Sequence, residues 1–286
     1  MNSIEKVVEL LKKNTREPHA RNEAQEDIHQ NLEKALDNRV NAKEALKIDL
    51  ECLEREGYIT PNTLGSIKAE EFRIIKRPIL QNAFGKSAVT IPNGNMIMVT
   101  SSLPDEGKTY ISLSLAMSIA LEMDKTVLLV DCDVINPSLS RLLDINEKTG
   151  LTDYLYDPKI TLEGIIINTD IPRLRLLPSG SQHLQSNELL TSARMSNLVN
   201  ELSERYADRV ILFDTPPLLL ANQAVVISQL MGQIIVVVEA EKTPQNLVLE
   251  AVEKLDEEKV IGVVLNKARK PSGTNYYGAY YGSPDN

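Results

Sequence analysis

Residues 96–122, MIMVTSSLPDEGKTYISLSLAMSIALE, decide the fold of this chain. The first six residues, Met96 to Ser101, form a short apolar run of strand length. A turn that contains Gly107 follows, and the stretch from Thr109 to Glu122 is typical of a helix. A strand, a turn and a helix in immediate succession are the repeating unit of α/β proteins, so the pattern predicts that class.

The turn between the strand and the helix matches a phosphate-binding loop. Gly107, Lys108 and Thr109 agree with the pattern G-x-x-x-x-G-K-[ST], whereas Ser102 replaces the first glycine. In such a loop the main-chain N–H groups point at phosphates, the lysine reaches the β- and γ-phosphates, and the hydroxyl binds Mg²⁺. A chance Gly-Lys-Thr at a helix start is the alternative, but the strand before the turn favours the loop. The expected ATP and Mg²⁺ site comprises Ser102, Pro104, Asp105, Glu106, Gly107, Lys108, Thr109 and Tyr110.

Strands and helices continue to alternate up to residue 266. The expected strands are 126–130, 174–178, 209–213, 233–238 and 260–266, and the expected helices are 186–206, 223–230 and 245–258. Because the strands are apolar without strict alternation, we expect both of their faces to be buried. The fold class is therefore α/β, with a doubly wound, mainly parallel sheet of the P-loop NTPase type over residues 83–270.

The two ends of the chain differ from this core. Residues 1–82 are charged and helix-favouring, which predicts a helical N-terminal extension with helices over 4–13, 46–58 and 67–80. Pro78 is expected to kink or end the last of them. Residues 271–286 are rich in glycine and tyrosine and predict a flexible tail.

The composition excludes several classes of function. The 286 residues carry 31 lysines and arginines against 40 aspartates and glutamates, and this net charge of −9 argues against general binding to nucleic acid. No apolar run reaches the roughly 18–20 residues of a membrane span, and no signal-peptide core is present. Cys52 and Cys132 suit free thiols in a reducing compartment. We therefore expect a cytoplasmic protein.

Three aspartates follow apolar strands. Asp131 and Asp133 come after one expected strand, and Asp214 comes after another. The carboxyl ends of parallel strands meet at the edge of the sheet where α/β proteins bind ligands. Each aspartate alone could be a helix cap or a turn residue, but together they favour a nucleotide–metal site. The expected metal ligands are Thr109 and Asp214, with Asp131 acting through water.

The same residues suggest phosphoryl transfer to a hydroxyl group. Lys108 and the metal would offset the charge on the transferred group, and Asp133 would accept the proton of the acceptor. The expected catalytic residues are Lys108, Asp131, Asp133 and Asp214. Cys132 alternates with these acids, so we expect it to face the packed interior.

Four of the nine tyrosines lie close together near the C-terminus. They are Tyr276, Tyr277, Tyr280 and Tyr281. Their glycine-rich surroundings predict an exposed cluster that could accept phosphate from the site described above. Stacking on nucleic acid and packing against the chain's own domain are the alternatives.

The motifs together resemble the bacterial tyrosine autokinases of exopolysaccharide and capsule production, most of all the cytoplasmic ones of exosortase-associated gene clusters. The phosphate loop, Asp131-Cys132-Asp133, Asp214-Thr215-Pro216 and the tyrosine cluster occur in that family's order. The resemblance implies a protein-tyrosine kinase, which converts ATP and protein tyrosine to ADP and phosphotyrosine. It also implies a ring-like homo-oligomer, in which a tail enters a neighbour's site. A membrane-anchored polysaccharide chain-length regulator, or co-polymerase, would recruit it to the inner face of the plasma membrane.

Further residues enter through the same resemblance. Glu70, Arg73 and Lys76 match the family's Glu-x-x-Arg-x-x-Arg oligomerisation helix, with lysine in place of the second arginine. Asn266 is similar in position to a base-contacting asparagine of related folds. Ile135 departs from the family, which usually has arginine there.

Two alternatives share the expected fold. Positioning or partitioning ATPases carry a signature lysine at the place of Leu103 and have no need of a tyrosine tail. A nucleotide-gated scaffold without catalysis would suit Ser102 and Ile135. Phosphorylation of the tail would separate the kinase from both.

Overall fold

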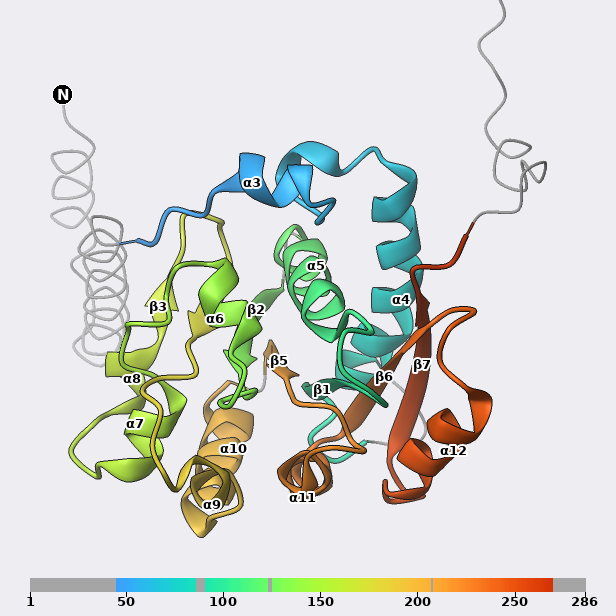
Figure 1. Ribbon diagram of the computed structural model, residues 1–286. Helices are drawn as coiled ribbons and strands as arrows, with labels where there is room; N and C mark the ends of the chain where they lie inside the picture. The colour runs from blue at the N-terminus through green and yellow to red at the C-terminus, as the bar shows by residue number, and fades with distance from the viewer. Residues whose placement is uncertain (1–44, 86–90, 123–124, 207, 270–286) are drawn as a thin grey trace, which may run out of the picture. The chain divides into compact units, whose positions relative to one another are not determined.

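The computed structural model describes residues 45–85, 91–122, 125–206 and 208–269 (Figure 1). The described residues from Leu46 onward belong to one compact unit. The helix expected over 4–13 and the tyrosine cluster lie outside the described residues.

A seven-stranded sheet forms the centre of this unit. Its strands are β1 (Met96–Ser101), β2 (Thr126–Asp131), β3 (Ile167–Asn168), β4 (Leu174–Leu177), β5 (Arg209–Asp214), β6 (Gln233–Glu239) and β7 (Val260–Asn266). Their order is β3-β4-β2-β5-β1-β6-β7, and every pair is parallel except β3–β4. The predicted α/β class with a mainly parallel sheet is confirmed. The two residues of β3 are too few to produce a periodicity in the sequence, so this strand was not predicted.

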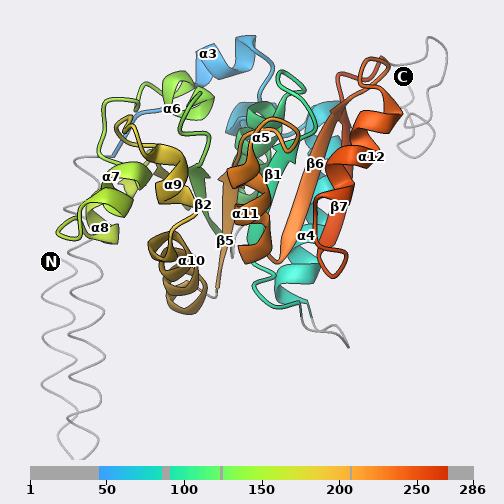
Figure 2. The same ribbon diagram turned by 60° about the horizontal axis from the view of Figure 1, so that its bottom comes forward.

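Helices cover both faces of the sheet (Figures 1 and 2). They are α3 (Leu50–Arg55), α4 (Ile67–Phe84), α5 (Lys108–Ala120), α6 (Ser138–Leu142), α7 (Leu151–Tyr156), α8 (Leu162–Ile165), α9 (Ser186–Leu190), α10 (Ala193–Arg205), α11 (Asn222–Leu230) and α12 (Gln245–Glu253), with a 3₁₀ turn at Pro61–Thr63. Side chains of α3, α4, α5 and α6 share one buried cluster, and those of α7 to α12 share the other. The sheet is therefore covered on both sides, which agrees with its apolar strands.

Four helix predictions differ from the structure. The helix expected over 245–258 ends at Glu253. The helix expected over 46–58 spans only Leu50–Arg55, because Gly57 takes a left-handed conformation that breaks it. The helix expected over 186–206 is two helices, since the Ser192 side chain caps the N-terminus of α10. Pro78 lies inside α4 without ending it, on an exposed position where the lost hydrogen bond is open to water.

Helix α4 packs on α5 rather than standing apart from the sheet. Phe72 and Ile79 are 4% and 6% exposed and belong to the same cluster as Ile111 of α5. The Lys76 ammonium donates to the carbonyl of Ser118 at 2.9 Å and pairs with Glu122 at 2.6 Å. This end of the expected N-terminal extension thus contributes to the core under the phosphate loop.

None of the helices in the described ranges is both long and apolar enough to cross a membrane.

Because α4 packs on α5, truncating a buried apolar residue of α4 should lower the free energy of unfolding more than truncating an exposed one. Phe72→Ala removes a ring that is 96% buried, so it should lower the free energy of unfolding by about 3–5 kcal/mol. Ile74→Ala truncates a side chain that is 57% exposed and should cost about 0.5 kcal/mol or less. Urea titration of both variants checks this, and equal losses would contradict the docking of α4.

Candidate nucleotide site

The phosphate loop joins β1 to α5 through two left-handed residues. Gly107, the N-cap of α5, has φ of +95°, and a side chain there would collide with the amide of Asn266. Asp105 has φ of +63°, a conformation that aspartate tolerates better than most residues. Glycine at position 107 is therefore required by the backbone angle and by the close approach of Asn266.

The loop presents unpaired hydrogen-bond donors. Within the described part of the chain, the main-chain N–H groups of Gly107, Lys108 and Thr109 have no internal partner. The Ser102 hydroxyl is buried and also lacks a partner there. The start of a helix attracts anions through its free N–H groups and its dipole. These donors fit the phosphates of a nucleotide.

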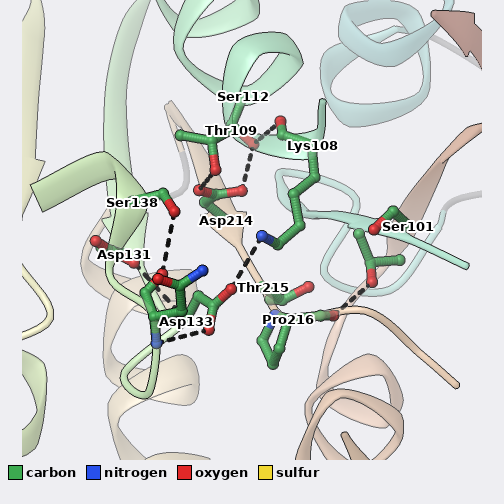
Figure 3. A network of polar contacts seen from close by, with 12 residues as sticks. Ser101, Lys108, Thr109, Ser112, Asp131, Asp133, Ser138, Asp214, Thr215 and Pro216 are labelled. Carbon is green, nitrogen blue, oxygen red and sulfur yellow. Dashed lines mark hydrogen bonds and ion pairs between the residues drawn. The ribbon is translucent and has the colours of Figure 1, made fainter. Parts of the chain in front are cut away.

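Asp214 lies at the end of β5 and faces the start of α5 (Figure 3). The sheet register places it opposite Val99 of β1 and Asp131 of β2. Its carboxylate accepts from the hydroxyl of Thr109 at 2.8 Å and from that of Ser112 at 3.0 Å. Ser112 was not singled out in the sequence, although its position four residues after Lys108 puts it on the same face of the helix.

Lys108 and Asp133 form an ion pair. The Lys108 Nζ lies 2.9 Å from a carboxylate oxygen of Asp133, and both side chains are largely buried (Figure 3). Burial works against the charge of Lys108, but Asp214 and Asp133 raise its pKa above the ordinary value. The lysine is therefore held as a cation beside the phosphate loop.

Asp131 contacts protein donors rather than the lysine. It accepts from the N–H and hydroxyl of Ser140, at 2.9 and 2.7 Å, and from the N–H of Asp133 at 3.2 Å. Burial, with Asp214 nearby, raises the pKa of Asp131 to about 7. Burial likewise raises the pKa of Asp214 to about 6, although Lys108 and two hydroxyls oppose the rise. Each carboxyl thus pays an energetic cost to ionise in this protein without a ligand.

The oxygen donors at this edge suit Mg²⁺. Within the described ranges, no group of three or more His, Cys, Asp or Glu side chains could hold a metal alone. Mg²⁺ in nucleotide sites needs only one or two protein oxygens, because phosphates and waters supply the rest. The Thr109 hydroxyl and the Asp214 carboxylate, 2.8 Å apart, fit that requirement.

Three expected nucleotide-binding side chains have partners inside the protein. The Asn266 amide donates to the Glu106 carbonyl at 2.9 Å, and the Glu106 carboxylate accepts from the Leu103 N–H at 2.7 Å. The Tyr110 hydroxyl donates to the Gly57 carbonyl at 3.0 Å, and its ring packs near Tyr58. Pro104 and Asp105 are both exposed on the same loop.

Other predicted residues lie away from the loop. Glu70 and Arg73 pair with each other on the exposed side of α4, whereas Lys76 is buried against α5. Ile135, at the position of the family arginine, is 59% exposed. Cys132 is buried as predicted, and burial raises the pKa of its thiol well above the ordinary value.

Comparison with known proteins agrees with this geometry. A family model described as an AAA domain matches residues 95–260. Tyrosine-protein kinase YwqD of Bacillus subtilis is 30% identical over 223 residues, which are 77% of this chain and 89% of that protein. The succinoglycan biosynthesis transport protein ExoP of Rhizobium meliloti is 34% identical over 219 residues, 75% of this chain and 27% of that protein.

The chain belongs to the bacterial tyrosine-protein kinase family.

A solved structure of the family has the same architecture. The kinase domain of Escherichia coli tyrosine kinase ETK superposes with a TM-score of 0.64 at 26% identity, covering 76% of this chain and 84% of that one. The chain spans about a quarter of the length of longer tyrosine kinase relatives and of ExoP. The predicted membership of the tyrosine kinase family is thus confirmed.

The raised pKa of Asp214 predicts a pH-dependent stability. Its pKa is about 6 in the folded protein against an ordinary value of 3.8, so between these values the folded state holds more protons than the unfolded state. Stability without ligand should therefore fall as pH rises through this window. Asp214→Asn should remove about 3 kcal/mol of that fall, because asparagine does not titrate, and its amide can still bond both hydroxyls.

Urea titrations of the wild type and Asp214→Asn from pH 4 to pH 8 in a chelator check this. The variant should gain stability relative to the wild type as pH rises. Parallel pH profiles would contradict the buried, costly carboxylate.

Proposed function

We propose that this protein is an ATP-dependent tyrosine autokinase that phosphorylates its own C-terminal tyrosine cluster. The observation that carries the proposal is the Lys108–Asp133 ion pair at 2.9 Å beside the unpaired N–H groups of the loop. It places a cation for phosphate oxygens next to a carboxylate that can take a proton. Membership of the tyrosine kinase family supports the choice of a tyrosine hydroxyl as acceptor. The acceptors are Tyr276, Tyr277, Tyr280 and Tyr281.

Different residues bind the phosphates, hold Mg²⁺ and accept the proton. The N–H groups of Gly107, Lys108 and Thr109 bind phosphate oxygens, and Thr109 with Asp214 would hold Mg²⁺. Bound Mg²⁺ supplies positive charge that offsets the phosphate oxygens. A phosphate competes with Asp133 for Lys108, so nucleotide binding releases the Asp133 carboxylate.

Phosphoryl transfer forms one bond to the γ-phosphorus and breaks another. The phenolic oxygen of a tyrosine bonds to the γ-phosphorus, the bond from that phosphorus to the bridging oxygen of ADP breaks, and Asp133 accepts the phenolic proton. Lys108 stabilises charge on the transferred group. Asp131, held by Ser140, would help to hold Mg²⁺ through a water molecule.

Assembly is the second element of the proposal. An extension over residues 1–82 carries the oligomerisation helix near 67–80, and Glu70 with Arg73 on its exposed side would meet a neighbouring copy in a ring. The tail, residues 271–286, would enter a neighbour's site. Each phosphate adds about −1.5 to −2 charges, which the acidic edge of the sheet would repel, so phosphorylation would release the tail.

The process regulated would be exopolysaccharide polymerisation or export. The printed name of ExoP, a succinoglycan biosynthesis transport protein, supports this choice. A membrane-anchored chain-length regulator or co-polymerase would recruit the kinase to the inner face of the plasma membrane.

Incubation with Mg²⁺ and ATP, followed by intact and peptide mass spectrometry, tests the activity. The wild type should gain mass in phosphate steps on the peptide with residues 276–281, whereas Lys108→Met should gain none, because it lacks the cation that binds the phosphates. Lys148→Met changes an exposed lysine and should behave as the wild type. If the Lys108→Met protein, incubated alone, gained phosphate on its tail, the mechanism would be wrong.

Mixing two defective proteins tests transfer between subunits. A variant with phenylalanine at all four acceptor positions keeps its site, and Lys108→Met keeps its tail. Phosphate on the Lys108→Met tail in the mixture supports transfer between subunits, and none would contradict it.

A further inference from the structure

Glu106 is a buried acid in the middle of the phosphate loop, and its side chain is only partly explained by nucleotide binding. The residue is 2% exposed. One carboxylate oxygen accepts from the Leu103 N–H at 2.7 Å, and the other accepts from the hydroxyl of Thr243 and the N–H of Glu239 at 3.4 Å. The three donors come from the loop itself, from the last residue of β6 and from the segment that follows it.

Main-chain carbonyls of the phosphate loop also accept hydrogen bonds from side chains at the end of β7 and just after it. The Asn266 amide, at the end of β7, donates to the Glu106 carbonyl at 2.9 Å. The Lys267 ammonium donates to the Asp105 carbonyl at 2.6 Å and pairs with Glu239 at 3.1 Å. We call these four side chains, Glu106, Thr243, Asn266 and Lys267, the loop clasp. It joins the phosphate loop to the carboxyl ends of β6 and β7.

Electrostatics alone gives no reason for an acid at position 106. A carboxylate beside a phosphate site repels phosphates, and its burial costs free energy unless hydrogen bonds compensate. In the described ranges, no lysine, arginine or histidine forms an ion pair with Glu106. The benefit that remains is geometric, since the carboxylate bonds donors on two segments that are far apart in the sequence.

The loop has a conformation that needs support. Asp105 and Gly107, on either side of Glu106, both have positive φ. This conformation strains the backbone of Asp105, and Gly107 loses more conformational freedom on ordering than other residues do. A loop that must become ordered on binding loses affinity by the cost of that ordering. Bonds that hold the loop beforehand lower this cost.

We infer that Glu106 is a positioning residue that holds the phosphate loop in its binding geometry through Thr243 and the Leu103 N–H. The inference deepens the proposed function, on which it rests for the identity of the ligand as a nucleotide. Glu106 does not touch the reacting atoms, and it acts through the main chain of the loop.

Binding of a fluorescent ADP analogue with Mg²⁺ tests the role. Glu106→Ala should weaken binding about tenfold, which equals about 1.4 kcal/mol. Glu106→Gln should stay within about threefold of the wild type, because its oxygen can accept from Leu103 and its amide can donate to Thr243, so that only the long 3.4 Å bond from the Glu239 N–H is lost. If both variants bind the analogue as well as or better than the wild type, the acid only repels phosphate and the inference is wrong.

A second pair of variants tests the partner. Thr243→Val removes the hydroxyl and should weaken binding about threefold, whereas Thr243→Ser keeps the hydroxyl and should bind as the wild type does. Equal affinities in this pair would overturn the role of Thr243. The pair also decides the matter if Glu106→Ala fails to fold, which thermal unfolding would reveal.

The kinase assay adds a readout that general damage would not produce. At saturating ATP, Glu106→Ala should phosphorylate the tail at a rate within about threefold of the wild type, with a raised KM for ATP. A loss in kcat alone, with KM unchanged, would contradict positioning of the nucleotide. Because ADP binding needs no transfer, the binding series can hold even if no tail phosphate forms, so the two proposals fail separately.

Discussion

Three buried carboxylates share one edge of the sheet with a single lysine. Asp131 and Asp214 are fully buried and Asp133 is 4% exposed, and within the described part of the chain Lys108 forms an ion pair with Asp133. The protein reduces the repulsion with hydroxyl and N–H donors and with pKa values raised to about 7 for Asp131 and about 6 for Asp214. A bound divalent cation would relieve the same repulsion, so the site favours a ligand that brings one.

The fold serves this arrangement of charge. Parallel pairing of β2 with β5, and of β5 with β1, places Asp131 opposite Asp214 and Asp214 opposite Val99, just before the phosphate loop. Helix α5 then directs Thr109 and Ser112 at Asp214, while the N–H groups at its start have no partner among the described residues. Helix α4 packs against α5, and the loop clasp bonds the phosphate loop to the end of β7.

Much of this was predictable because local signals and sheet topology agree. An apolar strand followed by Gly107-Lys108-Thr109 predicted the loop and α5, and acids after apolar strands predicted the edge where they meet. The pairing of Lys108 with Asp133 depends on the path of the chain after β2. The alternation of side chains along a strand does not reveal that path. The short helices α6 to α8 carry too few residues for a helical period.

Residues whose role depends on packing were harder to predict. Lys76 matches an oligomerisation pattern in the sequence, but its ammonium bonds Ser118 and Glu122 inside the chain. Ser140 holds Asp131 from a helix of five residues that nothing in the sequence marks. Glu106 has the position of a nucleotide ligand, yet its carboxylate bonds protein donors.

The dependence of ADP affinity on Mg²⁺ tests the central claim most directly, because the crowded carboxylates should make a divalent cation necessary for tight binding. Calorimetric titration of ADP into the wild type at pH 8 would compare Mg²⁺ with a chelator. We expect affinity at least about tenfold higher with Mg²⁺. Equal affinity under the two conditions would contradict the assignment of this edge of the sheet as a nucleotide–metal site.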